Sequence, residues 1–327
     1  MDTDGDGEAS IILVMGMTGS GKSRFVNFLK PGATVEGSTL RSETSECQIV
    51  PIRVGRELVY VVDTPGFDDT DRSDAEVLDD ITRFLAAQYE SGVKLRGIIF
   101  LHRITDVRMQ GSALTHFHIF EELCGEEALG NVILLTTRWD ELDHIDTGRR
   151  RQQELRDEYW DSMIEHGSYV RKFHPASPDL AEALILRLLR RQDVVLQVQK
   201  DVMVQGKPLE ATSVGRFVVE RLEKRLESLA REIDKLEGDA DMAKAQGNPR
   251  LRRRIERRID KARSTRQAIL ASKRRLTTSI QSEVKEKVRK ERSTSRWKDG
   301  ISIFASIVGL TISATTNIIL PLLGVSL

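Results

Sequence analysis

Short apolar runs alternate with longer amphipathic segments over the first 195 or so residues. The runs typical of strands are Ile11–Met15, Gln48–Val54, Leu58–Val62, Gly97–Leu101 and Asn131–Thr136, and helical patterns follow at about 75–90, 113–124, 150–165 and 179–191. Only Gly55-Arg56-Glu57 separates the second strand from the third, which predicts an antiparallel hairpin. Because strands that alternate with helices form parallel sheets, the pattern predicts an α/β fold with a central, mostly parallel sheet.

From about residue 208 to residue 296 the strand pattern disappears. Apolar residues recur there at alternating steps of three and four, at Val219, Leu222, Leu226, Leu229, Ile233 and Leu236. Gly247-Asn248-Pro249 interrupts this seam, and a rougher one resumes at Leu251, Ile255, Ile259, Ala262, Ile269, Leu276 and Ile280. A helical coiled-coil hairpin is the simplest interpretation. A dimeric coiled coil and a solvated helix without a partner are the alternatives.

The last 27 residues, 301–327, contain no charged side chain. A helix of about 20 apolar residues crosses a bilayer core, so we expect a C-terminal hydrophobic helix over residues 301–323 that anchors the protein in a membrane. The basic stretch Arg250–Lys298 and Trp297 precede it, which places the rest of the chain on the cytosolic face of an intracellular membrane. The alternative is a buried helix that caps the hairpin, favoured by the several Ser and Thr residues and by Pro321.

Charge divides the chain near residue 249. The whole sequence is neutral, with 50 Lys+Arg and 50 Asp+Glu, but residues 1–249 hold 31 basic and 44 acidic side chains and residues 250–327 hold 19 and 6. This asymmetry indicates a separate basic module. With 5% aromatic residues, little is available for stacking on bases, and we expect no nucleic-acid partner. The sequence contains two cysteines, Cys47 and Cys124. This number excludes a disulfide scaffold and fits a reducing compartment.

The first expected strand runs directly into a phosphate-binding motif. Residues 16–23 read G-x-x-x-x-G-K-S, in the strand-to-helix setting that this motif requires. Backbone N–H groups of such a loop converge on phosphate oxygens, Lys22 contacts the β- and γ-phosphates, and Ser23 binds Mg²⁺. The candidate nucleotide-binding residues here are Gly16, Thr18, Gly19, Ser20, Gly21, Lys22, Ser23 and Arg24.

A second motif, Asp63-Thr64-Pro65-Gly66, follows the strand Leu58–Val62. The carboxyl ends of parallel strands form the ligand-binding edge of an α/β sheet. Asp63 is therefore a candidate Mg²⁺ ligand, through a water molecule, and Gly66 is placed to offer its N–H to a γ-phosphate.

A third motif follows the strand Asn131–Thr136 and bears on the choice of base. Thr137-Arg138-Trp139-Asp140 is similar to the N/T-K-x-D signature for guanine. Asp140 would accept hydrogen bonds from guanine N1 and N2, which adenine cannot supply, and the stem of Arg138 would pack on the base. The alternative is an aspartate that caps a helix. The nearest candidate for a segment behind the base is His174-Pro175-Ala176-Ser177.

These three motifs in this order resemble a septin-like GTPase of the TRAFAC class, close to the immunity-associated nucleotide-binding proteins and their fungal relatives. The resemblance covers residues 10–195 and is carried also by Asp63–Thr70 and by Ser42–Cys47, which is similar to the S-x-T-x-x-C switch segment of the family. It implies that Thr44 is the switch threonine and a Mg²⁺ ligand, and that Lys22, Thr44 and Gly66 serve catalysis. Phe67 stands where Ras-like proteins carry a water-orienting Gln, so hydrolysis is expected to be slow.

The sequence thus predicts a P-loop NTPase, or G domain, at residues 10–195. We expect a disordered acidic N-terminus (1–9), a linker (196–207), a basic helical region (208–298) and a hydrophobic tail (299–327). The predicted function is a membrane-tethered GTP/GDP switch with Mg²⁺-dependent hydrolysis, stimulated by a protein partner or by homodimerisation through the G domain, the coiled coil or both. Arg41, His102 and Arg103 are the first candidates for the stimulating residue. A coiled-coil scaffold with structural GTP, or a P-loop ATPase or small-molecule kinase, is the alternative.

Overall fold

A computed structural model describes residues 9–34, 47–55, 57–64, 66, 73–107, 109, 111–294 and 300–308. Outside these ranges lie, among other residues named above, the candidate stimulating residue Arg41, the predicted switch threonine Thr44, Phe67 and the tail beyond Val308.

The centre of the molecule is a six-stranded sheet in the order β2-β3-β1-β4-β5-β6. Its strands are β1 (Ser10–Gly16), β2 (Gln48–Val54), β3 (Glu57–Asp63), β4 (Lys94–Arg103), β5 (Val132–Thr137) and β6 (Tyr169–Lys172). β2 pairs with β3 in antiparallel fashion, and every other pair is parallel. The predicted mostly parallel α/β sheet and its antiparallel hairpin are confirmed.

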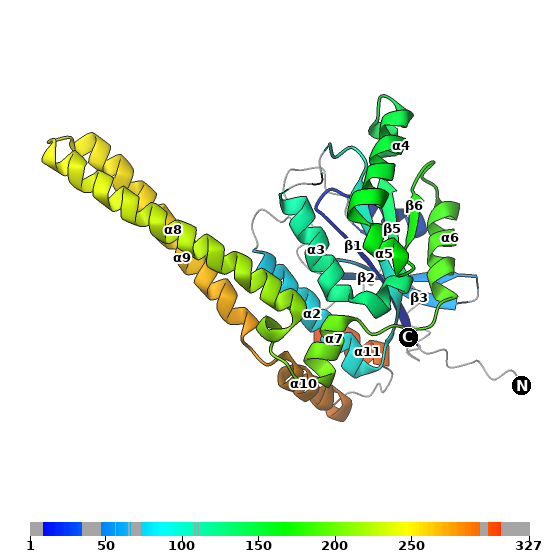
Figure 1. The fold of residues 1–327 in the computed structure, drawn as a ribbon. Helices are drawn as coiled ribbons and strands as arrows, with labels where there is room; N and C mark the ends of the chain where they lie inside the picture. The colour runs from blue at the N-terminus through cyan, green and yellow to red at the C-terminus, as the bar shows by residue number, and fades with distance from the viewer. Residues whose placement is uncertain are drawn as a thin grey trace, which may run out of the picture.

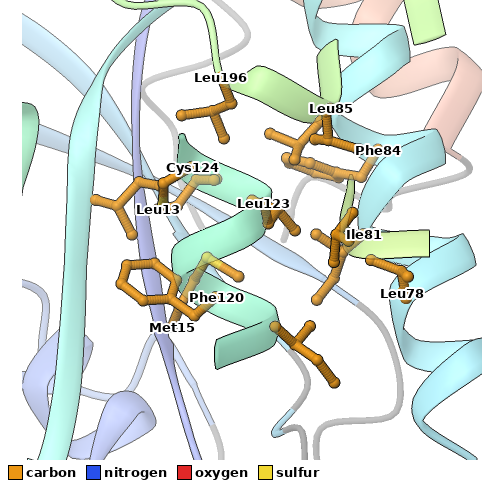
Figure 2. Packing of buried hydrophobic residues seen from close by; sticks show 14 of the residues in the cluster. Leu13, Met15, Leu78, Ile81, Phe84, Leu85, Phe120, Leu123, Cys124 and Leu196 are labelled. Atoms are coloured by element: carbon orange, nitrogen blue, oxygen red, sulfur yellow. The ribbon is translucent and has the colours of Figure 1, made fainter. Parts of the chain in front are cut away.

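Helices cover both faces of this sheet, and the alternation of side chains along β1 decides which core each residue joins. Ile12 and Val14 pack with α1 (Lys22–Leu29) and α6 (Pro178–Leu189). Leu13 and Met15 face the other side, where they meet α2 (Asp74–Ser91) and α3 (Ser112–Cys124). Figure 2 shows this second core, with Phe120, Leu123 and Cys124 of α3 between β1 and the α2 side chains.

The segment expected as one helix over 150–165 is divided. It forms α4 (Ile145–Glu154), a π-helical turn (Leu155–Tyr159) and α5 (Asp161–Glu165). Trp160 separates the last two and is fully buried in the core that α2 and α3 share. The strand β6 that follows carries a sequence, Tyr-Val-Arg-Lys, in which neither residue type nor length gives a strong strand signal. It was not predicted.

Residues 196–207, expected as a linker, belong largely to the core. They contain the short helix α7 (Gln197–Gln199) and a π-helical turn (Lys200–Val204). Leu196 and Val202 are fully buried, and Figure 2 shows Leu196 beside Leu85 and Cys124. Gln199 also donates a hydrogen bond to the Leu85 carbonyl oxygen (2.8 Å). Residues 196–203 of the predicted linker are therefore packed into the core.

The two longest helices, α8 (Ser213–Ala245) and α9 (Pro249–Leu276), pack against each other as a hairpin that extends away from the sheet (Figure 1). We call this hairpin the arm. Its seam contains Leu229, Leu236 and Ile233 from α8 and Ile255, Ile259 and Ala262 from α9, which all have buried side chains. The turn ends at Asn248, whose side chain caps α9 by accepting a hydrogen bond from the Leu251 N–H (3.1 Å). The structure thus shows the expected helical hairpin. Pairing of this seam with a second chain stays a prediction.

The base of the arm is fastened to the first turns of α2. The Arg275 guanidinium contacts three carboxylates of that helix, Asp79 (3.3 Å), Asp80 (3.2 Å) and Glu76 (3.6 Å). The Ser272 hydroxyl hydrogen-bonds to the Ser73 hydroxyl (3.0 Å), and Ser73 is itself the N-cap of α2. Burial raises the pKa of Asp79, opposed by the two guanidinium groups of Arg83 and Arg275.

The chain then returns along α2 through α10 (Ile280–Thr294) and α11 (Gly300–Val308) (Figure 1). Phe304 is fully buried and makes an edge-to-face contact with Phe84 of α2 (4.9 Å between ring centroids). The first turns of the expected membrane segment therefore pack on the α/β domain. Within the described residues no helix combines the length and the apolar character that a bilayer crossing needs. Residues 309–327 of the expected anchor lie outside the described part of the chain.

Candidate functional site

The phosphate-binding motif forms the turn between β1 and α1. Three of its glycines, Gly16, Gly19 and Gly21, have φ values of 140°, 76° and 92°, which favour glycine. At Gly16 a Cβ atom would also lie 2.4 Å from the Leu101 carbonyl oxygen, so no other residue fits without moving β4. The loop leads directly into the N-terminus of α1, whose free N–H groups favour an anion.

Lys22 is buried beneath this loop. Its ammonium donates hydrogen bonds to the carbonyl oxygens of Gly16 (3.1 Å) and Met17 (3.0 Å). Burial lowers the pKa of Lys22 to about 8, although the nearby Asp63 carboxylate opposes that shift. The lysine ammonium therefore bridges two carbonyl oxygens of the phosphate loop.

Ser23 and Asp63 come together although they are 40 positions apart in the sequence. The Ser23 hydroxyl donates a hydrogen bond of 2.7 Å to one carboxylate oxygen of Asp63. The second oxygen, Oδ1, is buried and has no hydrogen-bond partner among the described residues. Burial raises the pKa of Asp63, opposed by the Lys22 charge and the Ser23 hydrogen bond. A hydroxyl beside a carboxylate with an unused buried oxygen fits the oxygen ligands that Mg²⁺ prefers.

Residues Thr64 and Gly66 join the second motif to the phosphate loop. The Thr64 hydroxyl donates to the Val14 carbonyl oxygen (3.0 Å), which ties the end of β3 to β1. A Cβ atom on Gly66 would lie 2.4 Å from the Thr18 hydroxyl and 2.6 Å from the Thr18 backbone nitrogen. Gly66 thus lies directly against the phosphate loop, as the predicted γ-phosphate contact requires.

The third motif follows β5 and lies on the opposite side of the phosphate loop. The Thr137 hydroxyl donates to the Ser20 carbonyl oxygen (2.7 Å), and an Arg138 guanidinium nitrogen donates to the Gly19 carbonyl oxygen (3.3 Å). Arg138 also pairs with Glu141. Its backbone is left-handed (φ 61°), which turns the chain so that Asp140 follows at the mouth of a hollow.

This hollow lies between the phosphate loop and the third motif. It is lined by Gly21, Arg24, Phe25, Thr137, Arg138, Asp140, Phe173 and Ala176. Asp140 is half exposed and pairs with Arg24 (3.3 Å). Because exposed ion pairs contribute little, a base could displace Arg24 at small cost. Ala176 comes from the segment proposed to lie behind the base, and the structure places it in the same hollow.

Two of the three candidate stimulating residues lie at the end of β4 and differ in exposure. His102 is buried against Trp160, with 6.0 Å between ring centroids. Arg103 is partly exposed, pairs with Asp106 (3.1 Å), and has a guanidinium nitrogen 3.2 Å from the position that a Cβ atom would take on Gly19. The structure therefore brings Arg103 to the phosphate loop and turns His102 into the core. The sequence alone did not rank the two.

Burial lowers the pKa of His102 to about 4, with Asp106 opposing and Arg103 reinforcing the shift. The unfolded chain therefore takes up a proton on His102 below its ordinary pKa of about 6.5, whereas the folded chain does not until about pH 4. We expect this residue to cost the wild type about 2 kcal/mol of unfolding free energy at pH 5 relative to pH 7. Urea denaturation of wild type and His102→Gln at both pH values measures the difference.

The exposed His118→Gln variant is the matched control, since its side chain is 47% exposed. The expectation fails if His102→Gln loses as much stability between pH 7 and pH 5 as the wild type and the control do.

Comparison with known proteins agrees with this geometry. The model of the AIG1 family matches residues 10–150. "GTP-binding protein A" of Dictyostelium discoideum is 28% identical over 131 residues, which are 38% of this chain. The aligned stretch spans about a quarter (27%) of that relative.

Among solved structures, Toc33 of Arabidopsis thaliana in complex with Mg²⁺ and GMPPNP is similar at a TM-score of 0.45 and 18% identity, over 58% of this chain and 88% of that one. Era of Aquifex aeolicus bound to GDP.AlF4⁻ is similar at a TM-score of 0.42 and 15% identity, over 57% of this chain and 58% of that one. The family match covers all three motifs and the strands that carry them. Residues 10–150 are thus similar to a P-loop GTPase domain of the AIG1 family.

Proposed function

We propose that this protein is a GTP-binding switch with slow, Mg²⁺-dependent hydrolysis of GTP to GDP and phosphate. The observation that carries the proposal is the convergence of the second and third motifs on the phosphate-binding motif: Asp63 contacts Ser23, Gly66 lies against Thr18, and Thr137 contacts Ser20. Titration with GTP and ATP analogues tests it, and equal affinities for the two would contradict it.

Each side chain in this site has a distinct task in the proposed reaction. Ser23 and Asp63 are the residues that would hold Mg²⁺, which neutralises phosphate charge when it is bound. Lys22 and the loop N–H groups orient the triphosphate. Gly66, with no side chain, lets the chain after β3 approach the terminal phosphate. Thr44, outside the described residues, is proposed from the family resemblance as the switch threonine. The segments 37–47 and 64–74 would then change with the nucleotide and form the output surface.

Homodimerisation through the G domain is proposed to stimulate hydrolysis. One of the similar Toc33 structures is that of a dimerisation-deficient mutant, and another concerns chloroplast translocon components whose dimerisation is important for their GTPase activity. In this chain, Arg103 lies beside Gly19 of the phosphate loop, as Arg138 does, and of the two only Arg103 was a candidate stimulating residue. Such an arginine stabilises the charge that develops on the transferred phosphoryl group.

We therefore expect the hydrolysis rate per molecule to rise with protein concentration, and Arg103→Ala to abolish most of that rise. An arginine supplied to this transition state contributes on the order of 10³-fold or more, so a loss of at least tenfold is expected at high concentration. Single-turnover hydrolysis over two decades of concentration, alongside sedimentation, measures both effects.

Arg150→Ala removes an exposed arginine from α4 and serves as the control. If Arg103→Ala dimerises and hydrolyses GTP like this control, Arg103 does not act on the reaction. A wild-type rate that stays constant while the protein dimerises would contradict stimulation by the dimer.

A membrane tether through residues 301–323 is also part of the proposal, with the GTPase domain on the cytosolic face. The support is the uncharged sequence of the tail and the basic stretch that precedes it. Insertion of the whole segment requires α11 to leave its site on α2, because Phe304 cannot contact Phe84 and lipid together.

The substitution Leu310→Arg tests this tether by placing a charge in the tail. A charge near the bilayer centre costs roughly 2.5 to 3.5 kcal/mol on insertion scales, so we expect the variant to leave the membrane fraction. Val107→Arg, at a 73% exposed position far from the tail in sequence, is the control. Release of the wild-type protein by alkaline carbonate would contradict a spanning tail.

A further inference from the structure

The second helix of the arm is the most strongly charged surface of the described chain. α9 contains twelve Arg and Lys residues and only two acids, Glu256 and Asp260. α8, by contrast, is nearly balanced, with seven basic and eight acidic side chains. The arm therefore has one neutral helix and one basic helix along its whole length.

Some of these cations are already used inside the arm. Arg263 pairs with Glu237 of α8 (2.6 Å), and Arg258 approaches Glu232 of α8 (3.8 Å). Arg252 pairs with Glu256 one turn further along α9 (2.8 Å). These pairs balance part of the positive charge of α9.

A second group of cations on α9 is not used in such ion pairs. Arg250, Arg254, Arg257 and Lys261 recur at steps of four, three and four, so they lie on one face of α9. The four side chains are exposed, and within the described residues none has a carboxylate at ion-pair distance. We call this group the basic stripe. It is about 16 Å long at 1.5 Å per residue, and the seam residues Ile255 and Ile259 fall outside it.

Apolar side chains lie exposed beside the same end of the arm. Leu251 is 41% exposed and Met242 is 58% exposed, and both lie within a few residues of the turn at Gly247. Both side chains thus leave much of their apolar surface uncovered by the rest of the chain. That surface gains free energy where the tip meets an apolar medium or an apolar surface.

We propose that the basic stripe and the tip of the arm bind an anionic phospholipid surface. Arginine and lysine side chains beside such a surface are attracted to its headgroups, and aliphatic tips enter the boundary between headgroups and acyl chains. Nucleic acid also carries phosphate, but the arm offers Phe217 as its single aromatic residue and therefore no stacking platform, whereas Leu251 and Met242 suit lipid.

This surface is separate from the proposed tail anchor. The stripe lies at the far end of the arm, and α11 packs on α2 beside the base of the arm (Figure 1). Binding by the stripe depends on headgroup charge and salt, whereas insertion of the tail depends on neither. The two contributions can be measured apart in the same full-length protein.

The experiment is flotation of the full-length protein with vesicles of phosphatidylcholine alone and of phosphatidylcholine with phosphatidylserine, at about 0.1 M salt. The wild type should bind the phosphatidylserine vesicles at least tenfold more tightly, and the combined substitution of Arg250, Arg254, Arg257 and Lys261 by Gln should remove that difference. The Leu310→Arg variant should keep it, even if the tail proves not to insert.

A control of equal charge replaces four exposed arginines of the GTPase domain and its flank by Gln, at Arg150, Arg171, Arg190 and Arg191. Circular dichroism checks that each variant stays helical. A second variant, which combines Leu251→Asp with Met242→Asp, tests the apolar tip. It should bind the phosphatidylserine vesicles more weakly although the four cations remain.

Any of four results would overturn the proposal. The wild type could bind both kinds of vesicle equally, or the control could lose as much binding as the stripe variant. The stripe could instead bind a labelled oligonucleotide more tightly than the vesicles, or change self-association seen by sedimentation, which would identify a nucleic-acid surface or a contact between copies.

Discussion

Replacing Lys22 with alanine is expected to weaken GTP and GDP binding by on the order of 100-fold or more. The ammonium holds two loop carbonyl oxygens, at 3.0 and 3.1 Å, and supplies the positive charge below the phosphate position. Hydrogen bonds to charged groups contribute about 1.5 to 3 kcal/mol each, and 1.4 kcal/mol is a factor of ten in affinity. Calorimetric titration with GDP and a non-hydrolysable GTP analogue measures the loss.

Lys30→Ala is the matched control, because Lys30 lies just beyond the other end of α1 and its ammonium contacts only the Pro51 carbonyl oxygen (3.5 Å) in the described structure. The control should bind nucleotide like the wild type. Should Lys22→Ala also do so, with an unchanged melting temperature, the nucleotide site lies elsewhere.

The second large effect is a change of base preference in Asp140→Asn. The carboxylate is expected to accept hydrogen bonds from guanine N1 and N2, and the amide would instead offer a donor, which suits the exocyclic oxygen of xanthine. We expect affinity for GTP to fall by at least about tenfold, since an unpaired buried polar group costs about 1 to 3 kcal/mol. Affinity for XTP should rise. Competition among GTP, XTP and ATP for a fluorescent nucleotide measures all three.

Asp143→Asn makes the same chemical change at an exposed position three residues away and should leave the preference for GTP intact. If Asp140→Asn also retains that preference, Asp140 serves only to pair with Arg24, and the base site is assigned wrongly.

The parts of the site that the sequence predicted are those in which a short local pattern determines the geometry. A buried strand followed by G-x-x-x-x-G-K-S leaves few conformations for the loop, and the end of β3 places Asp63 at the same sheet edge because β1 and β3 are parallel neighbours. Both Asp63 and Ser23 were therefore expected at one Mg²⁺ site, and the structure places the two side chains in contact. The roles of the residues in binding and catalysis remain predictions.

The features that the sequence did not predict depend on contacts distant along the chain. Nothing local marks 196–203 as core, because the burial of this segment comes from packing against α2 and α3. α10 has an ordinary amphipathic pattern, and only the position of α2 explains why Ile280 and Val284 are buried there instead of continuing the arm. The difference between His102 and Arg103 has the same origin, since Trp160, which packs against His102, lies 58 positions later in the chain.

The arm is long compared with the short region that attaches it to α2. Ser73 and Arg275 define a short region at its base, next to the end of the segment 64–74. α8 has 33 residues, so the arm is about 50 Å long. A rotation of about 10° at this base would move the tip through about 9 Å, close to the diameter of an α-helix. An angular change too small to disturb the packing around Ser73 would therefore move the basic stripe by a large distance.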